Sequence, residues 1–208
     1  TVVNTFGLRK INSIEIMNLS EDGSNVVGDK NRINCDCLAL SGGWTPMVHM
    51  HTQSGGKLDF REIDQTFIPN EIDENHINVG SCNGDFELED IIKNTNNKVK
   101  NFLKVSETEF DNTSVLNSQE LDKRHIWLLP NYISEGKCKS FIDFQNDSTA
   151  KDIKLALREG FKSIEHVKRY TTTGMATDQG KLSNMHALGI IADTAGVKMG
   201  TLGTTTFR

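Results

Sequence analysis

The segment RYTTTGMATDQGKLSN, residues 169–184, separates two stretches that each have the apolar spacing of a helix. Its Thr, Gly and polar residues indicate a loop. Backbone amides at the start of the following helix favour an anion such as phosphate. Asp178 is placed to cap that helix, while Gln179 and Lys181 can hydrogen-bond a flavin ring or a phosphate. The same features also fit a capped polar turn that binds nothing.

Three helices are predicted around this loop. The first spans 148–160, the second 163–171 and the third 182–196, and each carries apolar residues along one side. The residues expected to begin or end them are Ser148 or Thr149, Gly160, Ser163 and Gly196. The sequence therefore predicts a small three-helix module.

The first half of the chain has a strand-like pattern. Residues 11–19 and 35–43 are predicted strands separated by a polar turn at 21–31, and the second has the continuous apolar character of a strand buried on both faces. A further buried strand is predicted at 76–85, followed by a helix over 86–104. Strand, glycine turn and helix in this order are typical of nucleotide-binding α/β sheets.

Glycine-rich turns follow both buried strands. In a parallel sheet, ligands bind beyond the carboxyl ends of the strands, so 42–46 and 80–85 are expected on one ligand-binding edge. Ordinary tight turns explain the same pattern equally well. No G-x-G-x-x-G segment follows a first strand, so the pyrophosphate-binding loop of a complete dinucleotide fold is missing. The candidate dinucleotide-binding residues are Gly42, Gly43, Gly80 and Asn83.

Composition limits the kind of protein. The 208 residues have a formal net charge of -5, which argues against nucleic acid as a partner, and 36% of them are hydrophobic. No apolar run reaches the roughly 18 residues of a membrane span, and no signal peptide is recognisable. We expect a cytoplasmic protein with reduced cysteines and two small units. Because the chain opens on Thr1, we also expect it to be a piece of a longer protein.

Other candidate sites have weaker support. His49 and His51 would share one face of a strand and bind a metal there, but no carboxylate or Cys ligand is spaced nearby, so no metal site is assigned. Cys35 and Cys37 are compatible with a redox pair or with small-residue packing. Nothing resembles a nucleophile elbow, and no catalytic residue is assigned. Basic residues within 149–171 suggest a DNA-reading helix pair that the acidic net charge disfavours.

One long motif carries a family resemblance. The segment FIDFQNDSTAKDIKLALREGFKSIEHVKRYTTTGMATDQGK, residues 141–181, closely resembles the alpha subunit of heterotetrameric sarcosine oxidase. Residues 35–60 resemble the later part of that subunit's NAD-binding domain, and 76–84 resemble its second glycine turn. GTTTFR at 203–208 resembles the lead into its aminomethyltransferase-like domain. The resemblance implies an interior slice of the subunit that is inactive in isolation.

The resemblance also implies a fold and a reaction. The expected fold class is α/β, with the later part of a Rossmann-like FAD/NAD-binding domain followed by the helical module. The expected reaction is oxidative demethylation of sarcosine to glycine, with FAD in the beta subunit, FMN at the alpha–beta interface, NAD on the alpha subunit and oxygen as acceptor. The implied partners are beta, gamma and delta-type subunits. The residues expected near FMN are Thr172, Thr173, Gly174, Thr177, Gln179 and Lys181.

The helical module further resembles small 2Fe-2S domains related to bacterioferritin-associated ferredoxin. Only Cys138 stands near a ligand position, and one thiolate cannot hold a cluster that needs four, so no iron–sulfur cluster is expected. The predicted divisions are a dinucleotide-binding part at 1–105, a linker at 106–137 with an apolar anchor at 125–130, the helical domain at 138–198 and a connector at 199–208. A non-catalytic subunit-docking module is the alternative function, and the identity of the secondary amine stays open.

Overall fold

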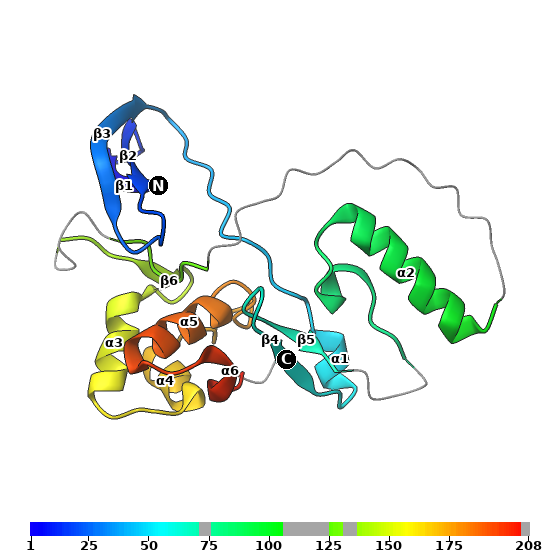
Figure 1. The fold of residues 1–208 in the computed structure, drawn as a ribbon. Helices are drawn as coiled ribbons and strands as arrows, with labels where there is room; N and C mark the ends of the chain where they lie inside the picture. The colour runs from blue at the N-terminus through cyan, green and yellow to red at the C-terminus, as the bar shows by residue number, and fades with distance from the viewer. Residues whose placement is uncertain (71–75, 106–124, 131–136, 205–208) are drawn as a thin grey trace. The chain divides into compact units, whose positions relative to one another are not determined.

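The computed structural model describes residues 1–70, 76–105, 125–130 and 137–204. The chain divides into two compact units (Figure 1). Unit 1 combines Thr1–Gly42 with Arg124–Thr204, and unit 2 consists of Gly43–Lys123 with Thr205–Arg208. Most of the predicted linker, 106–137, lies outside the described residues.

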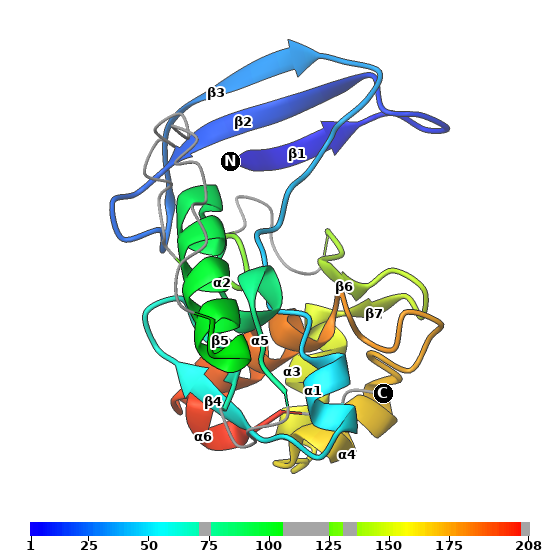
Figure 2. The ribbon, with the colours of Figure 1, turned by 90° about the vertical axis from the view of Figure 1, so that its right-hand side faces the viewer.

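Unit 1 begins with a three-stranded antiparallel sheet. Its strands are β1 (Val2–Phe6), β2 (Ser13–Leu19) and β3 (Val26–Asn34), and β2 pairs with both neighbours. Figure 2 shows β2 in the middle of the sheet. The apolar residues Ile14 and Met17 on β2 are buried, and β2 confirms the strand predicted at 11–19.

Two expectations for this region were wrong. The polar stretch predicted as a turn over 21–31 contains most of β3, whose residues are largely exposed and whose register is set by backbone pairing with β2. The buried strand predicted at 35–43 is absent, since the chain leaves the sheet after Asn34 and Leu40 is 78% exposed. An apolar run makes a buried strand only where layers cover both of its faces.

The second part of unit 1 is the helical module. A short hairpin, β6 (Phe141–Asp143) and β7 (Ser148–Thr149), leads into α3 (Ala150–Arg158). Then follow α4 (Ile164–Thr171), α5 (Asn184–Ala195) and α6 (Met199–Leu202), which lie together in both ribbon views (Figures 1 and 2). The three predicted helices are thus present, and the hairpin and α6 add to them.

Apolar residues spaced along the helices form the core of this module. Thr149 begins α3 with a capping box, in which its hydroxyl and backbone bond reciprocally with Asp152. Gly196 ends α5 in the left-handed conformation, as its position predicts. The predicted anchor at 125–130 contributes Trp127, whose ring lies so close to Gly189 that any Cβ there would collide with it. The buried apolar residues are Ala150, Ile153, Ala156, Ile164, Val167, Ala187, Leu188, Ile190, Ile191, Ala192 and Met199.

Unit 2 contains short elements and one long helix. The order is α1 (His49–Gln53), the hairpin of β4 (Leu58–Arg61) and β5 (Thr66–Pro69), the 3-10 turn η1 (Gly80–Asn83) and α2 (Leu88–Leu103). Helix α2 matches the helix predicted over 86–104. The strand predicted at 76–85 is wrong, because residues 76–79 have no regular secondary structure and the chain then turns into η1.

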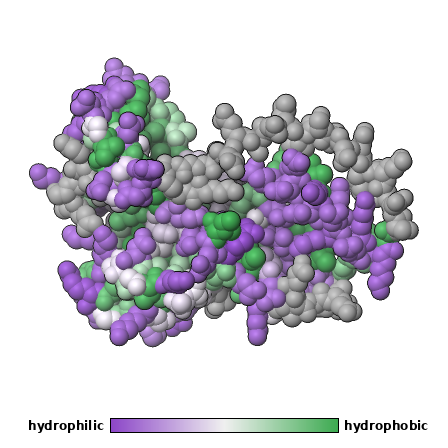
Figure 3. Space-filling view, viewed as in Figure 1, coloured by the Kyte–Doolittle hydropathy of each residue, from purple (hydrophilic) through white to green (hydrophobic). Residues whose placement is uncertain are grey.

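The expected mixture of helices and strands is confirmed, but the strands in the described residues pair only in antiparallel fashion, in three small sheets. A Rossmann-like parallel sheet is therefore not formed by the described part of the chain. None of the helices in the described ranges has the length and apolar composition that a bilayer span requires. The face in Figure 3 is mostly hydrophilic, with separate hydrophobic patches.

Candidate functional site

The loop between α4 and α5, residues 172–183, is the first candidate site. It begins where Thr172 adopts the left-handed conformation and ends α4. The Thr171 hydroxyl donates to the Val167 carbonyl at 2.8 Å and lies 2.9 Å from the Thr173 hydroxyl. Because Thr171 and Thr173 are both buried, these bonds fix the start of the loop on its interior side.

Asp143, at the end of β6, anchors the loop to the β6–β7 hairpin. The residue is 3% exposed, and its carboxylate accepts the Gly174 amide at 2.8 Å. The same carboxylate accepts the amides of Gln145 at 2.9 Å and Asn146 at 3.1 Å. The Asn146 side chain in turn donates to the Thr172 carbonyl at 2.9 Å. A buried charge is tolerated here because several N–H donors surround it.

Two further acceptors hold the outer part of the loop. The Gln145 side-chain oxygen accepts both the amide and the hydroxyl of Thr177, at 3.0 and 2.7 Å. The Asp178 carboxylate accepts the amides of Gly180 at 3.2 Å and Leu182 at 3.3 Å. Asp178 therefore fixes the turn that precedes α5. The prediction that it caps this helix was wrong, because the N-cap residue is Ser183, which makes no side-chain capping bond.

Two glycines make room for a buried asparagine. Gly174 and Gly180 have φ of 72° and 75°, and a Cβ on either would collide with the carboxamide of Asn184. Asn184 is 7% exposed, and its Nδ2 has no hydrogen-bond partner among the described residues. The glycines in this loop thus serve its internal packing as well as its turns.

The predicted flavin residues fall into two groups. Thr173 and Gly174 are buried and bonded within the protein, so their groups face inward. Thr172, Thr177 and Lys181 are exposed and Gln179 is half-buried. The amides of Gly174, Thr177, Gly180 and Leu182 are already engaged by the protein's own acceptors. An anion held by those amides would have to displace these acceptors. Contacts between the loop and a ligand are therefore left to the exposed side chains.

Sequence reasoning missed the residues that shape the loop from outside it. Asp143, Gln145 and Asn146 lie about 30 residues before the groups that they bind, and nothing in the loop sequence points to them. The available signal was the polar run D-F-Q-N-D-S after a short apolar stretch, which is typical of a side chain accepting amides within its own turn.

The turn η1 in unit 2 is the second candidate site. Gly80 has φ of 67°, and the Asn83 side-chain oxygen accepts Lys98 Nζ at 3.2 Å. Lys98 also donates to the Asn78 carbonyl at 3.4 Å, so α2 holds the segment on both sides of Gly80. Gly80 and Asn83 are thus the first and last residues of one turn, and their role in dinucleotide binding stays a prediction.

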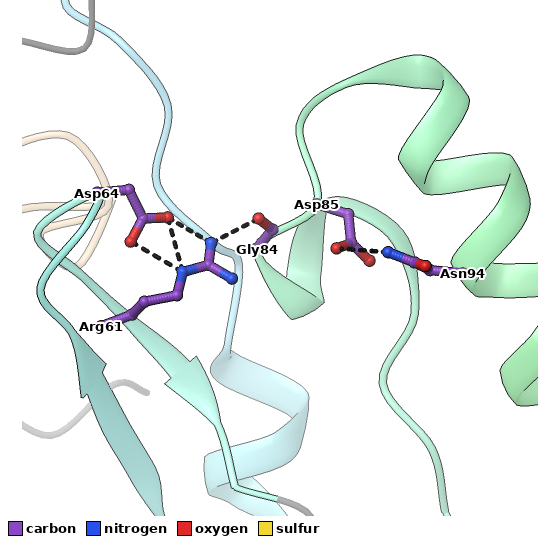
Figure 4. Close-up of polar contacts among 5 residues, drawn as sticks. All are labelled: Arg61, Asp64, Gly84, Asp85 and Asn94. Carbon is purple, nitrogen blue, oxygen red and sulfur yellow. Dashed lines mark hydrogen bonds and ion pairs between the residues drawn. The ribbon is translucent and has the colours of Figure 1, made fainter.

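Arg61 fixes the other side of this turn (Figure 4). Its Nη2 donates to the Gly84 carbonyl at 2.7 Å, and its guanidinium forms a bidentate ion pair with Asp64. The hydrogen bond to Asp64 raises the pKa of Arg61, and partial burial works against it. Figure 4 also shows Asp85 accepting the Asn94 side chain at 3.1 Å, which ties the turn to α2.

The predicted ligand edge that joins 42–46 to 80–85 is not supported. Neither segment follows a strand, and Gly42 and Gly43 are exposed residues without regular structure. Gly42 belongs to unit 1, whereas Gly43 belongs to unit 2. Among the described residues, no group of three or more His, Cys, Asp or Glu side chains is placed to hold a metal. None of the described cysteines forms a disulfide.

Comparison with known proteins identifies relatives of this chain. The model of the sarcosine oxidase A3 domain matches residues 137–208. The chain is 34% identical to the sarcosine oxidase subunit alpha of Rhizobium meliloti (strain 1021), in an alignment covering 100% of this chain and 20% of the relative. It is 32% identical to the subunit of the same name from Corynebacterium sp. (strain U-96), covering 88% of this chain and 20% of that relative.

The chain belongs to the sarcosine oxidase alpha subunit family. It spans about a fifth of the length of these relatives. The A3 match contains the β6–β7 hairpin, the helical module and the whole 172–183 loop, so the first candidate site lies in the part that the family model describes. In fold, the chain is similar to L-proline dehydrogenase from P. horikoshii, with a TM-score of 0.57 and 17% identity over 100% of this chain and 41% of that protein.

Proposed function

We propose that this sarcosine oxidase alpha-type chain supports flavin-dependent oxidative demethylation of sarcosine to glycine in a cytoplasmic complex with beta, gamma and delta-type subunits. The observation that carries the proposal is the match of the whole chain to a subunit that bears this enzyme's name. The chain supplies no catalytic residue of its own in this proposal. FAD would lie in the beta-type subunit, and no iron–sulfur cluster is invoked.

The proposed role of the 172–183 loop is to form one side of an FMN site shared with the beta-type subunit. FMN would supply the redox chemistry by accepting and passing on electrons. The residues that would hold it are the exposed or half-exposed Thr172, Thr177, Gln179 and Lys181, of which Lys181 offers a cation suited to a phosphate. Thr173 and Gly174, which are buried, would act indirectly by keeping the loop in one conformation.

The internal bonding of the loop supports this assignment. A surface that recognises a planar cofactor gains affinity when its conformation is fixed in advance, because less ordering is needed on binding. Here Asp143, Gln145 and Asp178 fix the loop from three points. A loop fixed in this way would hold its exposed side chains in constant positions for an incoming flavin.

NAD binding is also part of the proposal. The candidate residues in unit 2 are Asn83 and Gly80, which has no side chain to keep a ligand away from its backbone. Gly42 and Gly43 are the other two candidates, and both are exposed. Since the pyrophosphate-binding glycine loop is missing from this sequence, other parts of a longer subunit would have to supply most of the NAD site.

The test uses the assembled complex that contains this chain within its full alpha-type subunit. Lys181→Ala and Gln179→Ala should lower FMN retention about tenfold, the usual result of losing one charged hydrogen bond. Lys151→Ala, at an exposed position on α3, is the matched control and should retain FMN fully. Full FMN retention and turnover in both loop variants would favour the alternative, a non-catalytic docking module.

A further inference from the structure

Asn83, the last residue of η1, and Gly84, which follows it, form the only Asn-Gly pair in the sequence. The backbone nitrogen that follows an asparagine can attack Cγ of its side chain and close a five-membered ring. Glycine favours this attack, because it has no side chain to obstruct the approach and its backbone is conformationally free. The second candidate site therefore contains a chemically reactive pair.

The folded turn holds the two reacting groups in other directions. The Gly84 amide donates to the Ser81 carbonyl at 3.1 Å, so its nitrogen is engaged with the backbone and not with the Asn83 side chain. The Asn83 side-chain oxygen accepts Lys98 Nζ at 3.2 Å, which holds the carboxamide toward α2. Arg61 Nη2 fixes the Gly84 carbonyl at 2.7 Å. These contacts oppose ring closure as long as the turn is intact.

The contacts that close the turn are of a kind that opens locally. Hydrogen bonds in a 3-10 turn have poorer geometry than those in an α-helix. Ser81 is exposed, Asn83 is half-buried and the Arg61 side chain is 31% exposed, so water reaches the turn. Short segments with solvent-accessible hydrogen bonds open more often than the whole protein unfolds. Opening of η1 therefore frees the Gly84 nitrogen without global unfolding.

We propose that Asn83 is a modification site, which deamidates at a rate set by the opening of η1. The Gly84 nitrogen loses its proton and bonds to Cγ of Asn83, the carboxamide C–N bond breaks, and ammonia leaves with that proton. Water then hydrolyses the succinimide ring at either of its carbonyls, which leaves aspartate or isoaspartate at position 83. The reaction consumes one water and releases one ammonia, and nothing is oxidised or reduced.

The surroundings of Asn83 suit the product. Lys98 Nζ, which bonds the Asn83 side-chain oxygen, would form an ion pair with the new carboxylate. Isoaspartate also lengthens the backbone by one carbon atom before Gly84, which would shift the Gly84 carbonyl relative to Arg61. The modification itself does not depend on the proposed function. Its consequence for NAD does, because a negative charge at this candidate residue would repel the phosphates of a dinucleotide.

The experiment incubates the full chain near neutral pH and follows the peptide that contains Asn83 by mass spectrometry. In urea, where the turn is absent, Asn83 should convert faster than the other asparagines. In the folded chain its conversion should be at least about tenfold slower, because it waits for local opening. Arg61→Lys should speed the folded reaction about fivefold, the factor that corresponds to a loss of about 1 kcal/mol in the stability of the turn.

Lys93→Ala, at an exposed position on α2, is the matched control and should leave the folded rate unchanged. Asn83→Gln should abolish the mass gain, because the longer side chain closes a ring far more slowly. The proposal is overturned if Asn83 stays intact in urea, if its rates with and without urea are equal, or if a folded Arg61→Lys protein deamidates no faster. The unaltered chain decides the question even if Arg61→Lys fails to fold.

Discussion

The backbone amide of Gly174 donates a 2.8 Å hydrogen bond to the carboxylate of Asp143, 31 residues earlier in the chain. Replacing Asp143 by Ala would leave that amide and the amides of Gln145 and Asn146 without their acceptor. Unsatisfied buried donors cost about 1–3 kcal/mol each, and exposed ones less, so Asp143→Ala should lower the free energy of unfolding by about 3 kcal/mol. Urea denaturation measures this change.

Asp147→Asn is the matched control for that variant. Asp147 is exposed and has φ of 53°, a conformation that Asn accepts as readily as Asp. Its free energy of unfolding should stay within about 0.5 kcal/mol of the unaltered chain. A similarly small change in Asp143→Ala would show that the loop does not depend on this carboxylate.

The contact between Gly180 and Asn184 gives a second prediction. Gly180→Ala places a methyl group in a left-handed position and against the buried Asn184 carboxamide. Gly196→Ala, at φ of 65° with nothing within 4 Å of the new Cβ, carries the backbone strain alone. Strain costs about 1 kcal/mol and overpacking about 1–3 kcal/mol, so Gly180→Ala should be the more destabilising by about 2 kcal/mol. Equal losses in thermal or urea unfolding would show that Asn184 moves aside freely.

The helices of unit 1 could be predicted from sequence because their signals are local. Thr149 and Gly196 lie within one turn of the ends that they form, and the apolar residues recur with the helical period. These elements can be predicted without knowing what packs against their apolar sides.

The sheets and the loop anchors could not be predicted, because they depend on distant partners. β3 is polar and exposed, and pairing with β2 alone makes it a strand. Residues 35–43 have the composition of a buried strand but form none, and Leu40 is 78% exposed. Asp143 binds Gly174, which lies 31 residues later in the chain, and no local sequence pattern indicates this pairing. Long-range pairing of this kind overrides local propensity.

Arg61 provides a third prediction, in unit 2. Arg61→Lys keeps a positive charge but loses the bidentate contact with Asp64 and the directed bond to the Gly84 carbonyl. Because the side chain is partly exposed, we expect a loss of only about 1 kcal/mol in the free energy of unfolding. Lys93→Ala on the exposed side of α2 is the control and should change little. Faster hydrogen exchange at the Gly84 amide should accompany the Arg61 change only.

Asp22 gives a fourth prediction, which concerns pH. Hydrogen bonds from the Ser20 and Ser24 hydroxyls and the Ser24 amide lower the pKa of Asp22 from 3.8 to about 2. Since the folded pKa lies below the unfolded value, the stabilisation by this turn is complete above about pH 4 and is lost as the pH falls through 2. Carboxyl ¹³C titration should show the midpoint near 2, and the paired change Ser20→Ala with Ser24→Ala should return it toward 3.8. A midpoint that is the same in both proteins would mean that the two serines do not hold the carboxylate in solution.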